Sequence, residues 1–521
     1  MNRNIRRFLK NGISLALAAV LMRTVSVSFG AYVTGRVGAE GMALYSLIMS
    51  VYTLAVTFAT SGVQLATVRL VSEALGRQEE GAAHAALRTA LGYAAAFGTA
   101  AALVLFSGAS FFGCRLLGDG RTVPALRLLS VALLPVALSS VFSGYFTAVR
   151  RPTRAAAVSV GEQGLRIMLT VLALSALLPR GMTYACLALV GGSALAEMVS
   201  AVTLGLLYLF DRRRPRREGR AAPPVRALFG ITLPIAASSY IRSGLLSAEH
   251  ILIPRALEGG SATREEALVA YGTLSGMALP LALWPMAILS AFAGLLVPEF
   301  AERAARGEEK ANRRICEASL ALALAFGLLS GGILAAYALP LSRAVYGAGE
   351  VALYLALLAP ILPVMYLDHV TDVMLKGLGR QVYAMTVNIL DSLLSILLVL
   401  LLLPRLGALG YVLVIALAEI FNFSLSILGL SGVLSFRFPL LRGMLLPIAA
   451  ILPSITLARR LIPPSTTLSL ILSASLAVLL SLFLLLVLWR LFEKKVPKKQ
   501  KATPRPIDNR VGFGYNKREV N

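Results

Sequence analysis

Long apolar stretches recur along the whole chain, and this feature limits the fold more than any other. A membrane-spanning helix needs roughly 20 mostly apolar residues, and the sequence of 521 residues holds about fourteen stretches of this kind. Because 57% of the residues are hydrophobic and only 15% are charged, one water-soluble core cannot bury the apolar surface. We therefore predict an all-α integral membrane protein with about fourteen transmembrane helices.

The spans predict two lobes of six helices each, followed by two extra helices. The first span follows a basic N-terminus and is interrupted by Arg23, which favours an uncleaved helix over a signal peptide. The predicted domains are an N-terminal lobe (1–210), a basic cytoplasmic linker (211–226), a C-terminal lobe (227–432), two further transmembrane helices (433–492) and a basic cytoplasmic tail expected to be disordered (493–521). The predicted spans are 12–33, 41–61, 88–111, 125–146, 155–178, 182–209, 228–254, 268–297, 315–339, 351–375, 382–403, 408–431, 444–457 and 468–491.

Basic residues are divided unevenly between the loops of the two sides. With the N-terminus inside, the inner loops hold most of them, above all the arginine-rich linker, whereas most outer loops hold one or two. This is the positive-inside pattern, and it predicts a multi-pass protein of the bacterial cytoplasmic (plasma) membrane with both termini cytoplasmic. The net charge of +24 is then expected to face membrane lipids rather than nucleic acid. Two outer segments blur the pattern, one with Arg115, Arg121 and Arg127 and one with Arg459 and Arg460.

The two halves of the chain share an internal repeat. Corresponding residues keep their order at offsets of 219 to 229, and the matched pairs are Arg23 with Arg242, 70–73 with 296–299, Arg151 with Arg380, Glu162 with Asp391, and 194–197 with 416–419. A repeat of six helices brings the chain back to its starting side, so the two lobes are expected to be related by a pseudo-two-fold axis along the membrane normal. Two such lobes are expected to face each other across a central cavity.

Two arginines stand out among the charges predicted to lie at membrane depth. Such charges are costly, at least ~2.5 kcal/mol each, and normally face a bundle interior or a wet cavity. Arg23 and Arg242 each lie early in the first helix of a repeat, with no acidic residue three or four positions away. Two cavity arginines favour a phosphate or carboxylate ligand, because guanidinium keeps its charge and donates in a bidentate fork. The alternative is pairing across helices with Glu249, Asp391 or Glu197.

The remaining intramembrane charges predict a polar interior. Glu162 and Arg166 are four residues apart on one helix, which favours an internal salt bridge. Glu197 and Glu419, one in each repeat, favour helix-packing polar groups over proton carriers. The candidate cavity or coupling residues are Glu162, Arg166, Glu197, Glu249, Asp391 and Glu419.

Prolines predict bends in three helices of the second half. They are Pro234, the pair Pro280 and Pro285, and the pair Pro360 and Pro363. Each proline leaves a backbone carbonyl without its helical donor, and bent helices suit a transporter that alternates between two shapes.

Motifs for enzymatic chemistry are absent from the sequence. It contains no phosphate loop, no H-E-x-x-H and no G-x-S-x-G. Its three cysteines are far apart, so neither a disulfide framework nor a metal site is predicted. We expect no enzyme activity and no cofactor. A coupling ion, H+ or Na+, is left open.

Two blocks resemble a known family. Residues 270–281, followed by Trp284-Pro285 and 296–299, resemble the stage V sporulation protein B family of polysaccharide-biosynthesis membrane proteins, and so do 144–146 leading to 161–166. That family is similar to the lipid II flippases and shares a superfamily with the multidrug and toxin extrusion exporters. The resemblance covers about the first twelve spans. It implies a cavity-lining role for Arg23 and, less directly, for Arg242, whereas Ser247-Ala248-Glu249-His250 departs from the family's helix-seven pattern and puts transfer of a cation site in doubt.

The leading hypothesis is a flippase that moves an undecaprenyl-pyrophosphate-linked oligosaccharide, a peptidoglycan precursor or another envelope polysaccharide unit, by alternating access. Arg23 and Arg242 would hold the pyrophosphate. A cation-coupled multidrug exporter is one alternative, although it is expected to favour acidic cavity residues. A non-transporting scaffold that recruits envelope-synthesis enzymes is the other.

Overall fold

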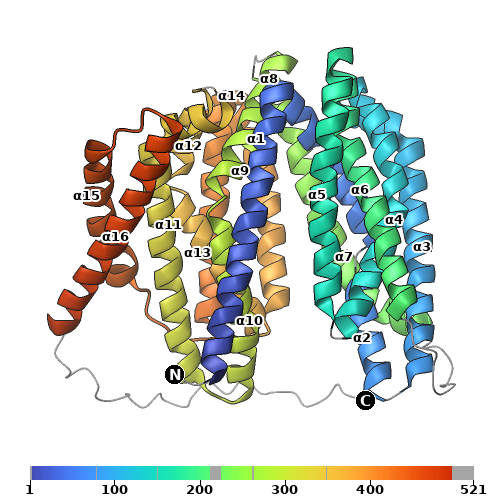
Figure 1. Cartoon of the computed structure of the whole chain (residues 1–521), viewed down its shortest axis with the longest axis horizontal. Coiled ribbons are helices and arrows are strands. Elements are labelled where there is room, and N and C mark those ends of the chain that lie inside the picture. Colours follow the sequence, from blue (N-terminus) through green and yellow to red (C-terminus); the bar gives the residue numbers. More distant parts are fainter. Residues whose placement is uncertain are drawn as a thin grey trace.

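The computed structural model contains only helices as regular structure within the residues that it describes, which are 3–60, 62–77, 79–149, 151–211, 225–260, 263–347 and 349–495 (Figure 1). The predicted linker and tail lie almost wholly outside them. The elements are α1 (Arg3–Thr60), α2 (Val63–Gly76), α3 (Glu80–Ser110), η1 (Phe111–Leu116), η2 (Gly120–Thr122), α4 (Val123–Ala148), α5 (Pro152–Leu177), η3 (Leu178–Arg180), α6 (Met182–Asp211), α7 (Val225–Glu258), α8 (Arg264–Tyr271), η4 (Gly272–Ala278), α9 (Leu279–Ala282), α10 (Met286–Ala305), α11 (Glu309–Tyr346), α12 (Val351–Leu358), α13 (Leu362–Gly377), α14 (Gln381–Ser431), η5 (Leu440–Leu445), α15 (Leu446–Leu461) and α16 (Thr467–Lys495).

Two of these helices are long enough to cross a membrane twice. α1 has 58 residues and α14 has 51, and each is broken at one glycine with positive φ, Gly38 at 71° and Gly407 at 59°. Only glycine adopts such angles without a steric penalty, so these residues mark the turns. The breaks lie where the sequence predicts the ends of the first and eleventh spans, which confirms those two boundaries.

The count of crossings agrees with the prediction. Among the described residues, nine helices are long and apolar enough to span a membrane, or eleven if each of two bent pairs counts as one span. Two of the nine, Leu21–Gly76 and Gln381–Ser431, contain the glycine breaks and therefore each supply two crossings. α7, with 34 residues, is about 50 Å long, which exceeds the thickness of the hydrocarbon core, but it is not among these nine helices.

Two of the three predicted proline bends are present. α8–α9 meets α10 at 58° beside Pro285, and α12 meets α13 at 57° beside Pro360. The prediction for Pro234 is wrong, because α7 continues as one helix through this position.

The repeat recurs in the secondary structure. Arg151 and Arg380, a matched pair, are the residues directly before α5 and α14. Each following helix then ends at a glycine with positive φ, Gly181 or Gly407, before the next one begins. The two halves therefore contain the same order of helices, and we call α1–α6 the N-lobe and α7–α14 the C-lobe.

The lobes lie side by side, with α1 between them. Figure 1 shows α3 and α4 at one edge of the molecule and α15 and α16 at the other, with α1 near the middle. α1 packs against α3 and α4 of its own lobe and against η4, α7 and α10 of the C-lobe. We refer to the end that holds α8 as the upper end and the end that holds α2 as the lower end (Figure 1).

Candidate functional site

A glycine of the C-lobe approaches the N-lobe closely. A Cβ atom at Gly272 would lie 2.0 Å from the carbonyl oxygen of Ala39 on α1, so no other residue fits there. Gly272 begins η4, a π-helix, and π-helical turns inside α-helices are frequent at functional positions. The family-like block 270–281 is thus the segment of the C-lobe that packs on α1.

Arg23 lies on α1 between the two lobes and is partly exposed. Next to it, Thr24 Oγ1 accepts a hydrogen bond from Trp284 Nε1 at 3.1 Å, and Trp284 lies at the bend between α9 and α10. Ser26 Oγ accepts one from Gln163 Nε2 of α5 at 2.7 Å. This part of α1 therefore contacts the N-lobe through α5 and the C-lobe through the bent helix.

Arg242 is exposed on α7, which packs on the second part of α1. The Tyr240 hydroxyl donates to the carbonyl of Phe58 at 3.2 Å, and Ser247 Oγ donates to the carbonyl of Ser50 at 2.9 Å. Arg242 is within electrostatic range of Asp368 and Asp391. It therefore lies between α1 and the acidic residues of the C-lobe.

Neither arginine forms an ion pair within the part of the chain that the structure describes. No carboxylate oxygen there lies within 4.0 Å of either guanidinium, and neither guanidinium takes part in a hydrogen bond. The structure thus does not contain the predicted alternative of pairing with Glu249, Asp391 or Glu197. Free guanidinium groups at a boundary between lobes are chemically suited to an anionic ligand.

The N-lobe charges form a closed group that we call the N-lobe network. Arg166 Nη2 lies 2.6 Å from Glu162 Oε1, which confirms the predicted i,i+4 salt bridge, and 3.9 Å from Glu197 Oε1 of α6. The hydroxyl of Tyr52 on α1 donates to Glu197 Oε2 at 2.5 Å. The network ties α1, α5 and α6 together. The sequence did not predict the contacts of Glu197 with Arg166 and Tyr52.

The C-lobe places four carboxyl groups near one another, and we call them the C-lobe acidic cluster. They are Glu249 of α7, Asp368 of α13, and Asp391 and Glu419 of α14, and they interact electrostatically. Ser395 donates to Glu249, and Asn422 Nδ2 donates to Asp368 Oδ2 at 3.3 Å. One buried oxygen each of Asp368 and Asp391 has no hydrogen-bond partner in the described residues. Carboxyl oxygens with spare acceptor capacity can take up a proton or contact a hard cation such as Na+.

These carboxyl groups do not form a ready metal site. No group of three or more His, Cys, Asp or Glu residues, among those described, could hold a metal ion. Asp368 lies within the predicted span 351–375, so the sequence indicates an intramembrane charge there, but it was not predicted to be a cavity or coupling residue.

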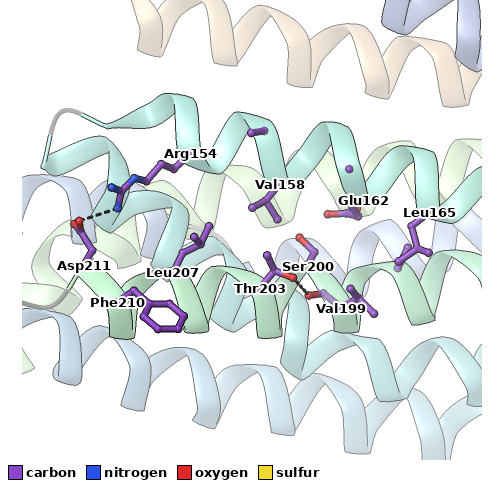
Figure 2. Close-up of a pocket in the computed structure, with 13 residues that line it drawn as sticks. Arg154, Val158, Glu162, Leu165, Val199, Ser200, Thr203, Leu207, Phe210 and Asp211 are labelled. Atoms are coloured by element: carbon purple, nitrogen blue, oxygen red, sulfur yellow. Dashed lines mark hydrogen bonds and ion pairs between the residues drawn. The ribbon is translucent and has the colours of Figure 1, made fainter.

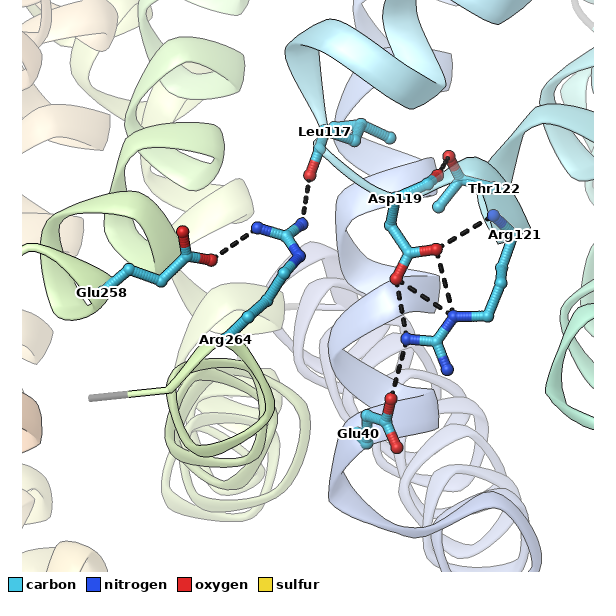
Figure 3. Close-up of polar contacts among 7 residues, drawn as sticks. All are labelled: Glu40, Leu117, Asp119, Arg121, Thr122, Glu258 and Arg264. Atoms are coloured by element: carbon cyan, nitrogen blue, oxygen red, sulfur yellow. Dashed lines mark hydrogen bonds and ion pairs between the residues drawn. The ribbon is translucent and has the colours of Figure 1, made fainter.

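The upper end carries hydrogen bonds between the lobes that we call the upper latch. Arg255 of α7 donates to the carbonyl oxygens of Arg115 and Leu116 at 2.5 and 2.6 Å. Arg264 of α8 donates to the carbonyl of Leu117 at 2.6 Å and pairs with Glu258 at 2.5 Å (Figure 3). Two guanidinium groups of the C-lobe thus bind three consecutive carbonyls of the N-lobe. No sequence signal identifies this contact, because backbone carbonyls are present at every residue.

The arginine beside the latch is neutralised within its own lobe. Arg121 donates to Asp119 through its backbone and side chain at 2.7 to 3.0 Å, and to Glu40 at 2.8 Å (Figure 3). Burial alone would raise the pKa of Asp119, but the hydrogen bonds and charge of Arg121, with the charge of Arg264, hold the pKa below its usual value. The charge of Arg121 is therefore balanced by acidic partners within the N-lobe.

The fold defines a class, that of polytopic helical membrane proteins with two lobes. The family described as polysaccharide biosynthesis protein matches residues 8–304, more than half of the chain. The protein belongs to this polysaccharide biosynthesis family. It is 26% identical over 420 residues to stage V sporulation protein B of Bacillus subtilis (strain 168), a match that covers 78% of this chain and 80% of the relative.

Two solved structures share the fold. The lipid II flippase MurJ in an inward closed conformation matches with a TM-score of 0.69 and 13% identity, covering 92% of this chain and 99% of that one. An inward-facing multidrug resistance MATE family transporter matches with a TM-score of 0.65 and 15% identity, covering 80% and 98%. The fold is thus common to flippases and exporters, and the family associates this chain with polysaccharide biosynthesis.

Proposed function

We propose that the protein is a flippase that moves an undecaprenyl-pyrophosphate-linked oligosaccharide across the bacterial cytoplasmic membrane by alternating access. The observation that carries this proposal is the pair Arg23 and Arg242, two guanidinium groups without an ion-pair partner in the described structure, on helices where the lobes meet. A pyrophosphate offers each of them a bidentate partner. The polyprenyl tail would stay in lipid while the headgroup passes between the lobes.

We assign the lower end to the cytoplasm. The sequence places most unbalanced basic residues on that side, including the linker that follows α6. The upper latch would then hold the lobes together on the outer side. In this arrangement the substrate enters from below, and transport requires the latch to open.

The C-lobe acidic cluster supports coupling to an ion gradient. Asp368 and Asp391 of this cluster lie within electrostatic range of Arg242, so a proton or Na+ that joins the cluster would change the field at the substrate arginine. One charge crossing 100 mV of membrane potential exchanges about 2.3 kcal/mol, which is enough to bias two conformations.

The same cluster favours a second candidate function, a cation-coupled multidrug exporter. Acidic residues are expected in the cavity of a protein that binds cationic drugs, and the exporter fold is similar. The two arginines favour the flippase, because they would repel a cationic drug at the boundary between the lobes.

Reconstitution separates these functions. The purified chain is placed in liposomes with a fluorescent lipid-linked oligosaccharide in the inner leaflet, and a membrane-impermeant quencher reports its arrival in the outer leaflet. Transport that needs the pyrophosphate supports the proposal. Efflux of a cationic dye without movement of the lipid would favour the exporter. If neither moves under an imposed proton or Na+ gradient, the scaffold that recruits envelope-synthesis enzymes is favoured.

A further inference from the structure

A groove of about 650 Å³ lies between α5 and α6 of the N-lobe (Figure 2). Apolar and small side chains line most of it, among them Val158, Leu165, Val199 and Leu207. The hydroxyl of Thr203 does not make it polar, because it is hydrogen-bonded to the carbonyl of Val199 at 2.7 Å. The groove therefore offers an apolar surface that none of the functions above uses.

The length of the groove fits one leaflet of a membrane. On α5 it runs from Arg154, near the lower end of the helix, to Leu165. At 1.5 Å per residue this distance is about 16 Å, close to half of the roughly 30 Å hydrocarbon core. A single acyl chain that enters from the lower surface would extend along its length.

The lower end of the groove carries a surplus of positive charge. Asp211 Oδ1 accepts a hydrogen bond from Arg154 at 2.7 Å, and both residues line the groove (Figure 2). Arg151, which does not line the groove, also donates to Asp211 Oδ1, so two guanidinium groups share one carboxylate. Phe210, 86% exposed, lies at the same end and has the character of a residue at the membrane interface.

At the far end of the groove, the charged side chains are paired with each other. Glu162, which lines it there, is paired with Arg166 of the N-lobe network. A bound molecule would therefore meet positive charge only at the lower end. Basic sites between transmembrane helices on the cytoplasmic side are typical binding positions for anionic lipid headgroups.

We propose that this groove binds an anionic phospholipid, with its phosphate at Arg154 and one acyl chain between α5 and α6. Such a lipid would brace α5, the helix that carries Gln163 and Arg166 toward α1 and α6. The proposal does not depend on the transported substrate.

Two glycines of α5 provide a matched test. Gly161 lines the groove, Gly164 does not, and a Cβ at either position would meet nothing within 4 Å. Gly161→Leu should fill the groove without disturbing packing, whereas Gly164→Leu adds the same side chain elsewhere on the same helix. The full chain is purified in nanodiscs with equal amounts of phosphatidylglycerol and phosphatidylcholine, and retained lipid is counted by native mass spectrometry.

The wild type should retain one phosphatidylglycerol in preference to phosphatidylcholine. Gly161→Leu and Arg154→Gln should each lower the retention of phosphatidylglycerol about tenfold. Gly164→Leu should retain as much as the wild type. Arg154→Lys should retain more phosphatidylglycerol than Arg154→Gln, because it keeps the positive charge. Equal retention of the two lipids, or equal loss in the two leucine variants, would overturn the proposal. So would displacement of phosphatidylglycerol by an equal concentration of undecaprenyl phosphate, which would assign the groove to the substrate path.

Discussion

The N-lobe and the C-lobe carry acidic residues at matched positions of the repeat but, among the described residues, only those of the N-lobe form ion pairs. In the N-lobe, Arg166 lies 2.6 Å from Glu162 and 3.9 Å from Glu197. Their counterparts in the C-lobe, Asp391 and Glu419, form no ion pair in the described residues. At the offset of 229 that relates Glu162 to Asp391, Arg166 corresponds to Ser395. The N-lobe network therefore contains an arginine at the position where the C-lobe acidic cluster has a serine.

The arginines at the upper end also differ between the lobes. Arg121 of the N-lobe is bound by Asp119 and Glu40 of its own lobe. In the C-lobe, Arg255 and Arg264 instead donate to carbonyls of the N-lobe. At the upper end, the N-lobe arginine is therefore held within its own lobe, whereas the two C-lobe arginines bind across the boundary between the lobes.

The largest effect is expected from removing the unpaired arginines. Arg23→Ala and Arg242→Ala should each lower flipping in the liposome assay about a hundredfold, because a charge-assisted contact to the pyrophosphate is lost. Arg36→Ala, on the same helix as Arg23, is the control and should keep the wild-type rate. Wild-type rates in both test variants at equal expression would exclude a substrate role for these side chains.

Replacing Arg166 of the N-lobe by serine, the residue at the matched position of the C-lobe, should lower the free energy of unfolding. Arg166→Ser leaves Glu162 and Glu197 without their cation, and we expect a loss of about 2 kcal/mol, less than for a fully buried pair because the Arg166 side chain is 35% exposed. Thermal unfolding in detergent, followed by tryptophan fluorescence, measures the change.

A matched surface pair checks this interpretation. Arg69 pairs with Glu73 at the same i,i+4 spacing but is 64% exposed, so Arg69→Ser should change stability by no more than about 0.5 kcal/mol. Equal shifts in the two variants would contradict a structural role for the N-lobe network.

The upper latch tests whether the C-lobe arginines change partners. Arg264→Ala removes a charged donor to the Leu117 carbonyl and should raise the population of molecules open at the upper end about tenfold. Spin labels at Cys114 and at Glu265→Cys, both exposed, report the separation of the lobes by pulsed electron resonance. Arg127→Ala, at the same end but directed to Ser110 of its own lobe, is the control. An unchanged distance distribution in Arg264→Ala would show that the latch does not hold the lobes.

The smallest effect concerns pH at the upper end. The pKa of Asp119 is lowered in the folded protein, so its ionised form stabilises the fold above about pH 4, and this contribution is lost as the pH falls through the lowered pKa. Asp119→Asn should therefore be less stable than the wild type at pH 7, by less than about 1 kcal/mol, and the difference should vanish in acid. A difference that persists unchanged below pH 3 would contradict the assignment.

Interactions within one helix, and the ends of helices, could be predicted from the sequence. The Glu162–Arg166 bridge follows from a spacing of four residues, and the turns at Gly38 and Gly407 lie between apolar stretches of spanning length. Proline bends were predicted at three positions, and two of them are present. At Pro234 the prediction is wrong, because α7 continues through this position.

Several contacts between helices were decided only by the tertiary structure. The partner of Glu197 is 31 residues away in the sequence, and the carbonyls bound by Arg255 and Arg264 are about 140 residues away. Whether Arg23 and Arg242 are paired depends on how α1 and α7 are rotated in the bundle, which hydropathy does not encode. The sequence by itself determined the spans, the repeat and the local salt bridge, because these depend on neighbours a few residues apart. Only packing decided which of the repeated charges found a partner, because that depends on distances between helices far apart in the chain.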